Sequence, residues 1–243
     1  MRQGLRGLGT LTAATLAVGG LSACGLVMGE TTEDASTLSG RITAVRLDNK
    51  SGGVTVNGTE GGGKPSLRRE ITYRGERPTG ATHRIENGVL VLGGCGSGCS
   101  VRYTVDVPAG TPVSGKVSNG SIHLSGVGAV KVTTGSGRIE MNGVTGTVEA
   151  ENTNGKITGE NIRGARIRAR STNGAITLTS VTAADVQATT TNGDVTLTVP
   201  KADYDVTAST VNGDRTIDVA HSPSAAHRLG LRSTNGDVTV RNP

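Results

Sequence analysis

The chain has 243 residues, which suits one domain of about 200 residues preceded by a leader segment. It contains 38 Gly, three Tyr and neither Phe nor Trp, so a core of stacked Val, Ile, Leu and Ala side chains is expected rather than a compact aromatic one. The net charge is +5, or +3 without Arg2 and Arg6, and basic residues are interspersed with acidic ones. Because there is neither a basic stripe nor a set of aromatic platforms for bases, the composition argues against nucleic-acid binding.

Residues 1–23 have the features of a signal peptide. Arg2 and Arg6 precede a mildly apolar run of about 14 residues, which is too short to span a bilayer. The run ends in Leu-Ser-Ala-Cys, closing at Cys24, and this motif resembles the lipobox of bacterial lipoproteins. The resemblance implies cleavage before Cys24, diacylation of its thiol and anchoring at the extracytoplasmic face of the cell membrane, since two acyl chains suffice for stable attachment. The alternative is an ordinary signal peptide with an incidental cysteine.

Residues 24–39 are expected to connect this anchor to the folded domain. They include Glu30, Glu33 and Asp34 and show no apolar periodicity. This composition predicts a flexible tether with a reach of roughly 20–25 Å. A domain beginning at residue 40 would then stand off the membrane.

Between residues 41 and 108, short apolar segments predict irregular strands separated by Gly- and Pro-rich loops. The segments are Arg41–Leu47, Gly53–Val56, Leu67–Tyr73, Val89–Leu92 and Val101–Val107. Cys95 and Cys99 lie between the last two, and in an exported protein such a pair favours a small disulfide loop. A redox pair usually has two residues between its cysteines and a helix after them, and a metal site would need further ligands, so both alternatives are weaker.

The rest of the chain repeats. Residues 165–181 (ARIRARSTNGAITLTSV) and 184–200 (ADVQATTTNGDVTLTVP) align with a period of 19 residues when Gly174 is placed on Gly193. In both segments, apolar and polar residues alternate on either side of a hydroxyl residue and an Asn-Gly turn. The same frame fits around Gly52, Gly120, Gly137, Gly155, Gly213 and Gly236. This period predicts an all-β fold, a β-solenoid over residues 40–243 whose two-strand rungs stack about 4.8 Å apart.

Asparagine precedes the turn glycine in nearly every copy. The residues are Asn119, Asn154, Asn173, Asn192, Asn212 and Asn235. Asn-Gly suits a corner because both residues tolerate positive φ. The row could be a ligand array or a structural ladder of stacked amides, and the ladder is favoured because Asn side chains stack in this way in other in-register β-structures.

The sequence offers few groups for catalysis or metal binding. Its four His are scattered over different copies, and it has no nucleophile–His–acid spacing and no phosphate-binding Gly loop. Asp follows Asn-Gly at Asp194, Asp214 and Asp237, but a spacing near 20 residues does not bring several carboxylates to one Ca²⁺. No catalytic residue, metal or cofactor is therefore predicted.

One charged cluster joins two neighbouring copies. Glu149 and Glu151 occupy the positions in one copy that Arg168 and Arg170 occupy in the next, so stacking should place Glu149 beside Arg168 and Glu151 beside Arg170. These residues could serve a polysaccharide-active β-helix enzyme. The preferred interpretation is a set of exposed ion pairs, each contributing about 0–1 kcal/mol.

The repeats, the Val-Pro end of the strand at residues 101–108 and the lipobox together resemble a known bacterial family. This is the "putative adhesin" domain of unknown function, which is built of β-strand repeats. The resemblance covers residues 41–243. It implies a right-handed, parallel β-helix-like solenoid at the cell surface, and it transfers no catalytic residue.

These features predict a non-enzymatic, lipid-anchored cell-surface protein that uses the solenoid as an interaction scaffold. Its expected partners are the membrane, through the diacylglycerol, and a protein or glycan of the cell envelope. The polysaccharide-active enzyme is one alternative. The other is self-association through the last copy, in which Val238 and Val240 would form an uncovered end strand open to pairing.

Overall fold

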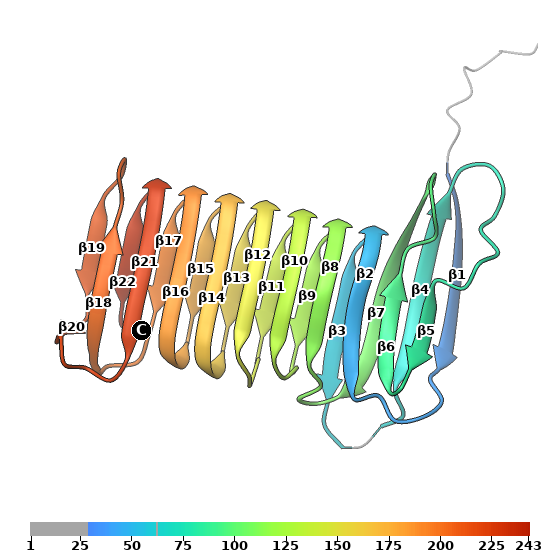
Figure 1. The fold of residues 1–243 in the computed structure, drawn as a ribbon, viewed down its shortest axis with the longest axis horizontal. Coiled ribbons are helices and arrows are strands. Elements are labelled where there is room, and N and C mark those ends of the chain that lie inside the picture. Colours follow the sequence, from blue (N-terminus) through green and yellow to red (C-terminus); the bar gives the residue numbers. More distant parts are fainter. Residues whose placement is uncertain (1–28, 62) are drawn as a thin grey trace, which may run out of the picture.

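The computed structural model describes residues 29–61 and 63–243, and this part of the chain consists of strands and connecting loops without a helix. Two 11-stranded sheets face each other across a thin core and form an elongated stack of rungs (Figure 1). The predicted all-β solenoid is therefore confirmed. The predicted signal peptide and Cys24 lie outside the described residues.

We call the two sheets A and B. In spatial order, sheet A consists of β1 (Glu30–Thr37), β4 (Ser66–Tyr73), β7 (Cys99–Pro108), β3 (Val54–Thr59), β9 (Ile122–Ser125), β11 (Ile139–Asn142), β13 (Ile157–Glu160), β15 (Ile176–Thr179), β17 (Val195–Thr198), β22 (Val238–Arg241) and β19 (Arg215–Asp218). Sheet B consists of β20 (Ala220–His221), β18 (Asp203–Ser209), β21 (Arg228–Asn235), β16 (Thr182–Asn192), β14 (Arg163–Asn173), β12 (Val148–Asn154), β10 (Val130–Ser136), β8 (Val113–Asn119), β2 (Ala44–Ser51), β6 (Val89–Gly93) and β5 (His83–Glu86).

Each central rung is a strand of sheet B, a glycine corner and a short strand of sheet A. Neighbouring rungs pair in parallel and in the register that the repeat predicts, so that Ile167 lies beside Val186 and Ala169 beside Ala188. Branched apolar side chains of both sheets fill the interior and are buried along the stack. The alternation of the sequence thus becomes two continuous apolar rows in sheet B facing two in sheet A.

The corner glycines are required by both conformation and contact. Gly155 has φ 138° and Gly193 has φ 140°, which side chains other than glycine rarely adopt. A Cβ added at Gly155 would also overlap the carbonyl oxygen of Gly137 in the preceding rung. Successive corners therefore stack backbone on backbone.

A polar residue, in most copies a hydroxyl, stands three positions before most corner glycines and is bonded to a neighbouring rung. Thr190 is 1% exposed, and its hydroxyl donates to the carbonyl oxygen of Gly174 in the preceding rung at 2.9 Å. Equivalent bonds run from Thr134 to Gly120, from Asn152 to Gly137, from Ser171 to Gly155, from Ser233 to Gly193 and from Thr210 to Gly236. This row satisfies corner carbonyls that the sheet ladders leave free.

The asparagines beside the corners form a second ladder on the outside of the stack. Amide-to-amide bonds of 2.8–2.9 Å link five of them in spatial order: Asn154, Asn173, Asn192, Asn235 and Asn212. Asn119 is outside this chain of bonds because Ser136 occupies the corresponding position in the rung between it and Asn154. The row is a structural feature of the stack, as in the ladder interpretation.

The rungs do not stack in sequence order at either end. At the C-terminal end, β21 and β22 insert between the rung of β16 and β17 and the rung of β18 and β19. At the other end, β2 lies between β6 and β8, and β3 lies between β7 and β9, so that β6 and β7 are nearer the end of the stack although they come later in the sequence. The prediction that Val238 and Val240 form an uncovered end strand is therefore wrong: β19 pairs with β22, and β19 is the edge of sheet A.

The predicted tether is also partly wrong. Residues 30–37 form β1, which pairs antiparallel with β4 over its whole length and ends sheet A. The strand carries polar residues on both faces, so it lacks the apolar alternation that identifies the other strands, and its neighbour supplies the pairing instead. The folded part consequently begins before residue 40.

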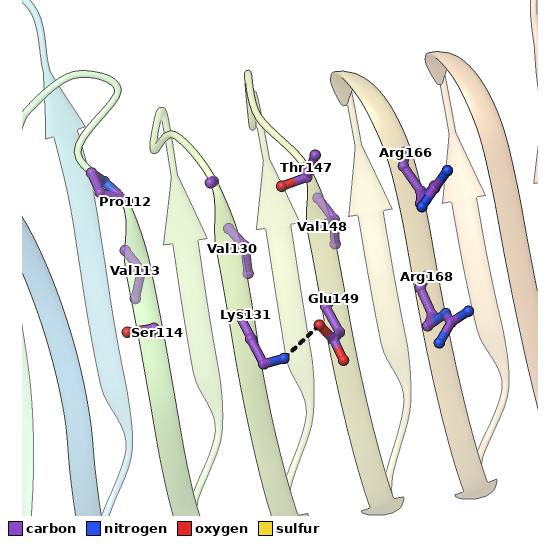
Figure 2. Close-up of a pocket in the computed structure, with 11 residues that line it drawn as sticks. Pro112, Val113, Ser114, Val130, Lys131, Thr147, Val148, Glu149, Arg166 and Arg168 are labelled. Atoms are coloured by element: carbon purple, nitrogen blue, oxygen red, sulfur yellow. Dashed lines mark hydrogen bonds and ion pairs between the residues drawn. The ribbon is translucent and has the colours of Figure 1, made fainter.

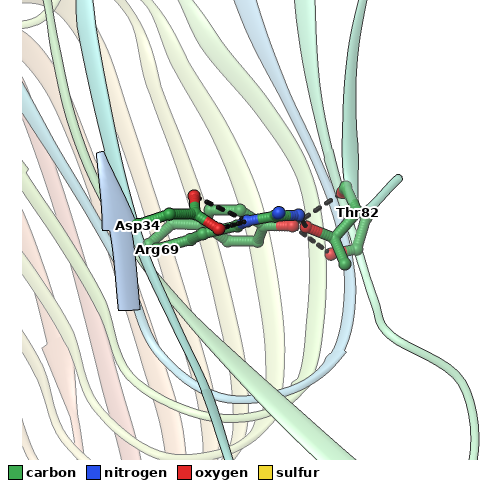
Figure 3. A network of polar contacts seen from close by, with 5 residues as sticks. Asp34, Arg69 and Thr82 are labelled. Carbon is green, nitrogen blue, oxygen red and sulfur yellow. Dashed lines mark hydrogen bonds and ion pairs between the residues drawn. The ribbon is translucent and has the colours of Figure 1, made fainter. Parts of the chain in front are cut away.

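A network of charged, hydroxyl and aromatic side chains lies at the β1 end of the stack (Figure 3). Arg69 of β4 faces Asp34 of β1, with Nε 2.8 and 2.7 Å from the two carboxylate oxygens, and Nη1 donates to the Thr82 hydroxyl at 2.9 Å. Behind it, the fully buried Tyr103 places its hydroxyl 2.6 Å from the Thr82 carbonyl oxygen and 2.8 Å from that of Gly93. These contacts hold the loop that precedes β5 against the β1 end of the stack.

Cys95 and Cys99 are joined by a disulfide in the connection between β6 and β7, with their Cα atoms 5.9 Å apart. Both sulfur-bearing side chains are half-buried and pack on the edge of the apolar core. The bond closes a loop of only a few residues, so its effect is expected to be local.

Candidate interaction surface

The outer face of sheet B concentrates charged side chains in three rows. The outward positions of successive strands superpose in register, so each row contains one residue per rung. The first row contains Arg166, Asp185, Arg228 and Asp205; the second Ser114, Lys131, Glu149, Arg168, Gln187, Gly230 and Thr207; the third Lys116, Thr133, Glu151, Arg170, Thr189, Arg232 and Ser209. This face is the strongest candidate for an interaction surface.

Part of this face forms a hollow of about 470 Å³ over β8, β10, β12 and β14 (Figure 2). Lys131 and Glu149 meet in it, with Nζ and a carboxylate oxygen 2.8 Å apart. The hydrogen bond from Lys131 is the main cause that lowers the pKa of Glu149, and the charges of Lys131, Arg168 and Arg170 act in the same direction. The same bond raises the pKa of Lys131.

The predicted neighbours Glu149 and Arg168 are indeed in register, as are Glu151 and Arg170. The close contact of Glu149, however, is with Lys131 on its other side. In the part of the chain that the structure describes, Arg168 and Arg170 have no carboxylate within 4.0 Å of their guanidinium nitrogens. The ion pairs predicted for them are not formed, and these two arginines are available to a ligand.

This geometry does not favour general-acid catalysis by Glu149. A carboxyl group that donates a proton at neutral pH needs a raised pKa, which usually comes from an apolar environment. Glu149 is partly exposed and its pKa is lowered by a cation, so it remains ionised. Its arrangement suits electrostatic binding better than proton transfer.

The outer face of sheet A differs in chemistry. Over the rungs of β13, β15, β17, β22 and β19 its central row is threonine: Thr158, Thr177, Thr196, Thr239 and Thr216. Nearer the other end, His123 Nδ1 lies 2.7 Å from a Glu140 carboxylate oxygen, and Glu140 also approaches Arg138. Charge available for recognition is therefore greater on sheet B.

Two of the three aspartates that follow the Asn-Gly corners accept hydrogen bonds from backbone amides. Asp194 accepts a bond from the amide of Asp237 at 2.9 Å, and Asp237 accepts one from the amide of Asp214 at 2.8 Å. Within residues 29–61 and 63–243, no three His, Cys, Asp or Glu side chains are close enough together to hold a metal ion. These carboxylates thus strengthen the corner between adjacent rungs.

Sequence reasoning missed Arg228, Gly230 and Arg232 as part of this face. The repeat frame places all three at outward positions, but it does not say that β21 stacks directly on β16. The signal was the distance of 43 residues from Gly193 to Gly236, which is two rungs and leaves their spatial order open. Lys131 was visible in the frame, at the position equivalent to Glu149 in the preceding copy.

The parallel rungs, buried hydroxyl row and glycine corners define a two-sheet β-solenoid of the strand-repeat class. Residues 29–242 match the family described as Toastrack DUF4097, and the chain belongs to this family. The match begins at the residue before β1, in agreement with a domain that includes that strand. None of the curated proteins matches the chain in sequence.

Two solved structures are similar to this chain at low sequence identity. A protein of Bacteroides fragilis described as a "putative adhesin" is 14% identical, with a TM-score of 0.52 over 88% of this chain and 97% of its own. A "putative cell adhesion protein" of Clostridium sporogenes is 10% identical, with a TM-score of 0.41 over 88% of this chain and 100% of its own. Among the described residues, none belongs to a helix with the length and apolar character needed to cross a bilayer.

Proposed function

We propose that this protein is a non-enzymatic, lipid-anchored interaction scaffold that presents the outer face of its solenoid outside the bacterial cell membrane. The observation that carries the proposal is the exposed outer face of sheet B, on which Arg168 and Arg170 have no acidic partner among the described residues. Membership of the Toastrack family and the fold shared with a protein described as a "putative adhesin" support a binding role. The lipobox-like motif at Cys24 supports the anchor.

The position of β1 limits how far the stack can lie from the membrane. Only five residues separate Cys24 from Glu30, so a lipidated Cys24 would keep the β1 end of the stack within about 20 Å of the membrane surface. With 11 strands in each sheet, the stack extends roughly 50 Å, and the rung of β18 and β19 would be its far end. Sheet B would then be accessible along most of its length.

Replacing Cys24 tests the proposed attachment to the membrane. In cells producing the Cys24→Ser variant, the protein should be absent from the membrane fraction. Protease added to intact cells should no longer cleave a surface-attached form of it. The control is a Cys95→Ser/Cys99→Ser variant, which keeps the motif and should stay membrane-bound. Unchanged membrane retention of Cys24→Ser would refute the anchoring part of the proposal.

A polysaccharide-active enzyme is the second candidate, since Glu149, Glu151, Arg168 and Arg170 share one face. It requires turnover of acidic or neutral glycans that disappears in Glu149→Gln and Glu151→Gln variants. We expect no turnover, because Glu149 is held ionised by Lys131.

Self-association is a third candidate, now at a different strand. Every residue of β19 is exposed, Ile217 is 37% exposed and the nearby Val211 is 66% exposed, so this edge could pair with a second copy. Sedimentation over a range of concentrations would show growth in size that an Ile217→Lys variant abolishes. A monomer at all concentrations would exclude this candidate.

A further inference from the structure

We propose that the arginine-rimmed hollow over Gly230 on sheet B binds the carboxylate groups of an acidic polysaccharide. This inference rests on the proposed role of sheet B as an interaction surface, and it names the class of ligand. The hollow measures about 250 Å³ and adjoins the one around Lys131, with which it shares Arg166 and Arg168. Its walls are Arg166, Arg168, Asp185, Gln187 and Arg228.

Three strands bring these groups together from two distant segments. β14 and β16 are consecutive, and β21 joins them only because its rung inserts before that of β18. The outward residues form a grid in which β14 supplies Arg166, Arg168 and Arg170, β16 supplies Asp185, Gln187 and Thr189, and β21 supplies Arg228, Gly230 and Arg232. The arginine columns are thus two strand spacings apart, about 10 Å.

The charges of this grid are only partly neutralised. Arg166 pairs with Asp185 at 3.6 Å and Arg228 with Asp205 at 3.4 Å. Arg168, Arg170 and Arg232 have no such partner in the described part of the chain, and all three are exposed. Arg168 lies in the wall of the hollow, and Arg170 and Arg232 lie one outward position further along β14 and β21. Together these free guanidinium groups make a site for an anion at and beside the hollow.

Gly230 creates the space. Its row carries Arg168 and Gln187 on the preceding strands, whereas Gly230 has no side chain, and a Cβ built there would meet only the Val186 carbonyl oxygen at 3.9 Å. Gly230 is not at positive φ, so the backbone does not require glycine at this position. The absence of a side chain therefore serves the shape of the outer face and not the conformation of the strand.

The chemistry of the grid fits a carboxylated glycan. Guanidinium groups bind carboxylates through two parallel hydrogen bonds, and the Gln187 amide and Thr189 hydroxyl can donate to and accept from sugar hydroxyls. The three strands carry no aromatic side chain on which bases could stack, which disfavours a nucleic acid. The open face also lets a chain continue beyond the hollow in both directions across the strands.

The test is binding of the purified full chain to galacturonic acid oligomers, measured by titration calorimetry. The fully methyl-esterified oligomer is the matched ligand control, because it keeps the sugar and removes the charge. Binding of the acidic oligomer and not of its ester is the expected result. Equal binding of both, binding of neither, or stronger binding of polyphosphate, dextran sulfate, single-stranded DNA or anionic vesicles would overturn the proposal.

Two sets of variants separate a shaped site from general attraction. Arg168→Gln/Arg170→Gln should weaken binding about tenfold or more, since each loses charge-assisted bonds. Gly230→Thr keeps the charge and fills the hollow, and it should weaken binding about tenfold as well. Arg68→Gln/Arg241→Gln removes the same charge from the exposed face of sheet A and should change affinity less than twofold (about 0.4 kcal/mol).

The variants also define how the proposal would fail. Equal weakening by the sheet A pair would mean non-specific attraction, and full affinity in Gly230→Thr would mean that the hollow is not the site. Thermal unfolding of each variant shows whether it is folded, and Gly230→Thr should be at least as stable as the parent because Thr suits a strand better than Gly. Since binding is measured in solution, its loss is distinguishable from loss of surface display in Cys24→Ser.

Discussion

At the residue scale, the corner glycines show why the repeat is so regular in sequence. Each is held at a backbone conformation that favours glycine and lies against the corner of the next rung. This double constraint explains why Gly is kept at the corner even where its preceding Asn is replaced by Ser136. The frame could be found from sequence because every rung repeats the same local requirement.

We predict that Gly155→Ala destabilises the fold by about 2–3 kcal/mol, because Ala is strained at φ 138° and its Cβ would overlap the Gly137 carbonyl. The matched control is Gly230→Ala, where space is open and the stability should be unchanged or slightly raised. Chemical denaturation of the two variants checks this. Similar midpoints for both would contradict the stacking role of the corner.

Tyr103 should make stability sensitive to alkaline pH. Burial raises its pKa from 10.0 to about 12, so above pH 10 the unfolded chain loses this proton while the folded chain retains it. The free energy of unfolding should therefore fall between pH 10 and 12, by up to about 2–3 kcal/mol from this group, and show no contribution from it at lower pH.

The Tyr103→Phe variant isolates this effect. It loses the hydroxyl bonds to Thr82 and Gly93, so it should be about 1–2 kcal/mol less stable at pH 7. Its stability should then decline less steeply between pH 10 and 12 than that of the parent. Denaturation curves that stay parallel over this range would show that Tyr103 ionises as freely in the folded as in the unfolded chain.

At the scale of the element, a rung is held by ladders that run perpendicular to its strands. The buried hydroxyl row is the least obvious of these, because a polar residue in a thin apolar core is costly unless it is bonded. The sequence has a hydroxyl before most of the turns, yet its partner cannot be predicted from one copy. The acceptor is a carbonyl of the neighbouring rung and exists only once the rungs stack.

We predict that Thr190→Val, which keeps the shape and removes the hydroxyl, costs about 1–3 kcal/mol by leaving the Gly174 carbonyl without this donor. Thr177→Val is the matched control, since Thr177 lies on the partly exposed outer face of sheet A. Thermal unfolding of both variants measures the difference. If the two substitutions cost the same, the buried bond has no stabilising role.

At the scale of the whole molecule, local pattern predicts the rungs but not their order. The repeat spacing shows which segments form rungs, but it leaves open which rung lies outside another, and the irregular copy around Gly213 forms the outer rung with every residue of β19 exposed. The tether was mispredicted for a related reason. β1 has polar residues at its inward positions, so its place in sheet A depends on pairing with β4 and on the Asp34–Arg69 contact.

The order of the C-terminal rungs gives a deletion experiment. Removing residues 203–226 shortens the path from Gly193 to Gly236 from 43 to 19 residues, which is one rung, and leaves β21 and β22 stacked on β16 and β17. The variant should keep its β-sheet circular dichroism and unfold cooperatively, with lower stability and more self-association because a terminal rung is lost.

The control for this deletion removes the same number of residues, 163–186, from the middle of the stack. It shortens the path from Gly155 to Gly193 from 38 to 14 residues, which does not match a rung, so this variant should not fold. Equal loss of structure in both deletions would show that the outer rung is essential to the stack and not an added layer.

The claim most in need of measurement is that sheet B is an interaction surface. The full chain, immobilised through a C-terminal tag, would be exposed to solubilised envelope glycans and proteins of the producing cell, and retained material identified by mass spectrometry. We expect retention of an acidic glycan that is lost in Arg168→Gln/Arg170→Gln and kept in Arg68→Gln/Arg241→Gln. Retention that is indifferent to the sheet B arginines, or no retention at all, would contradict it.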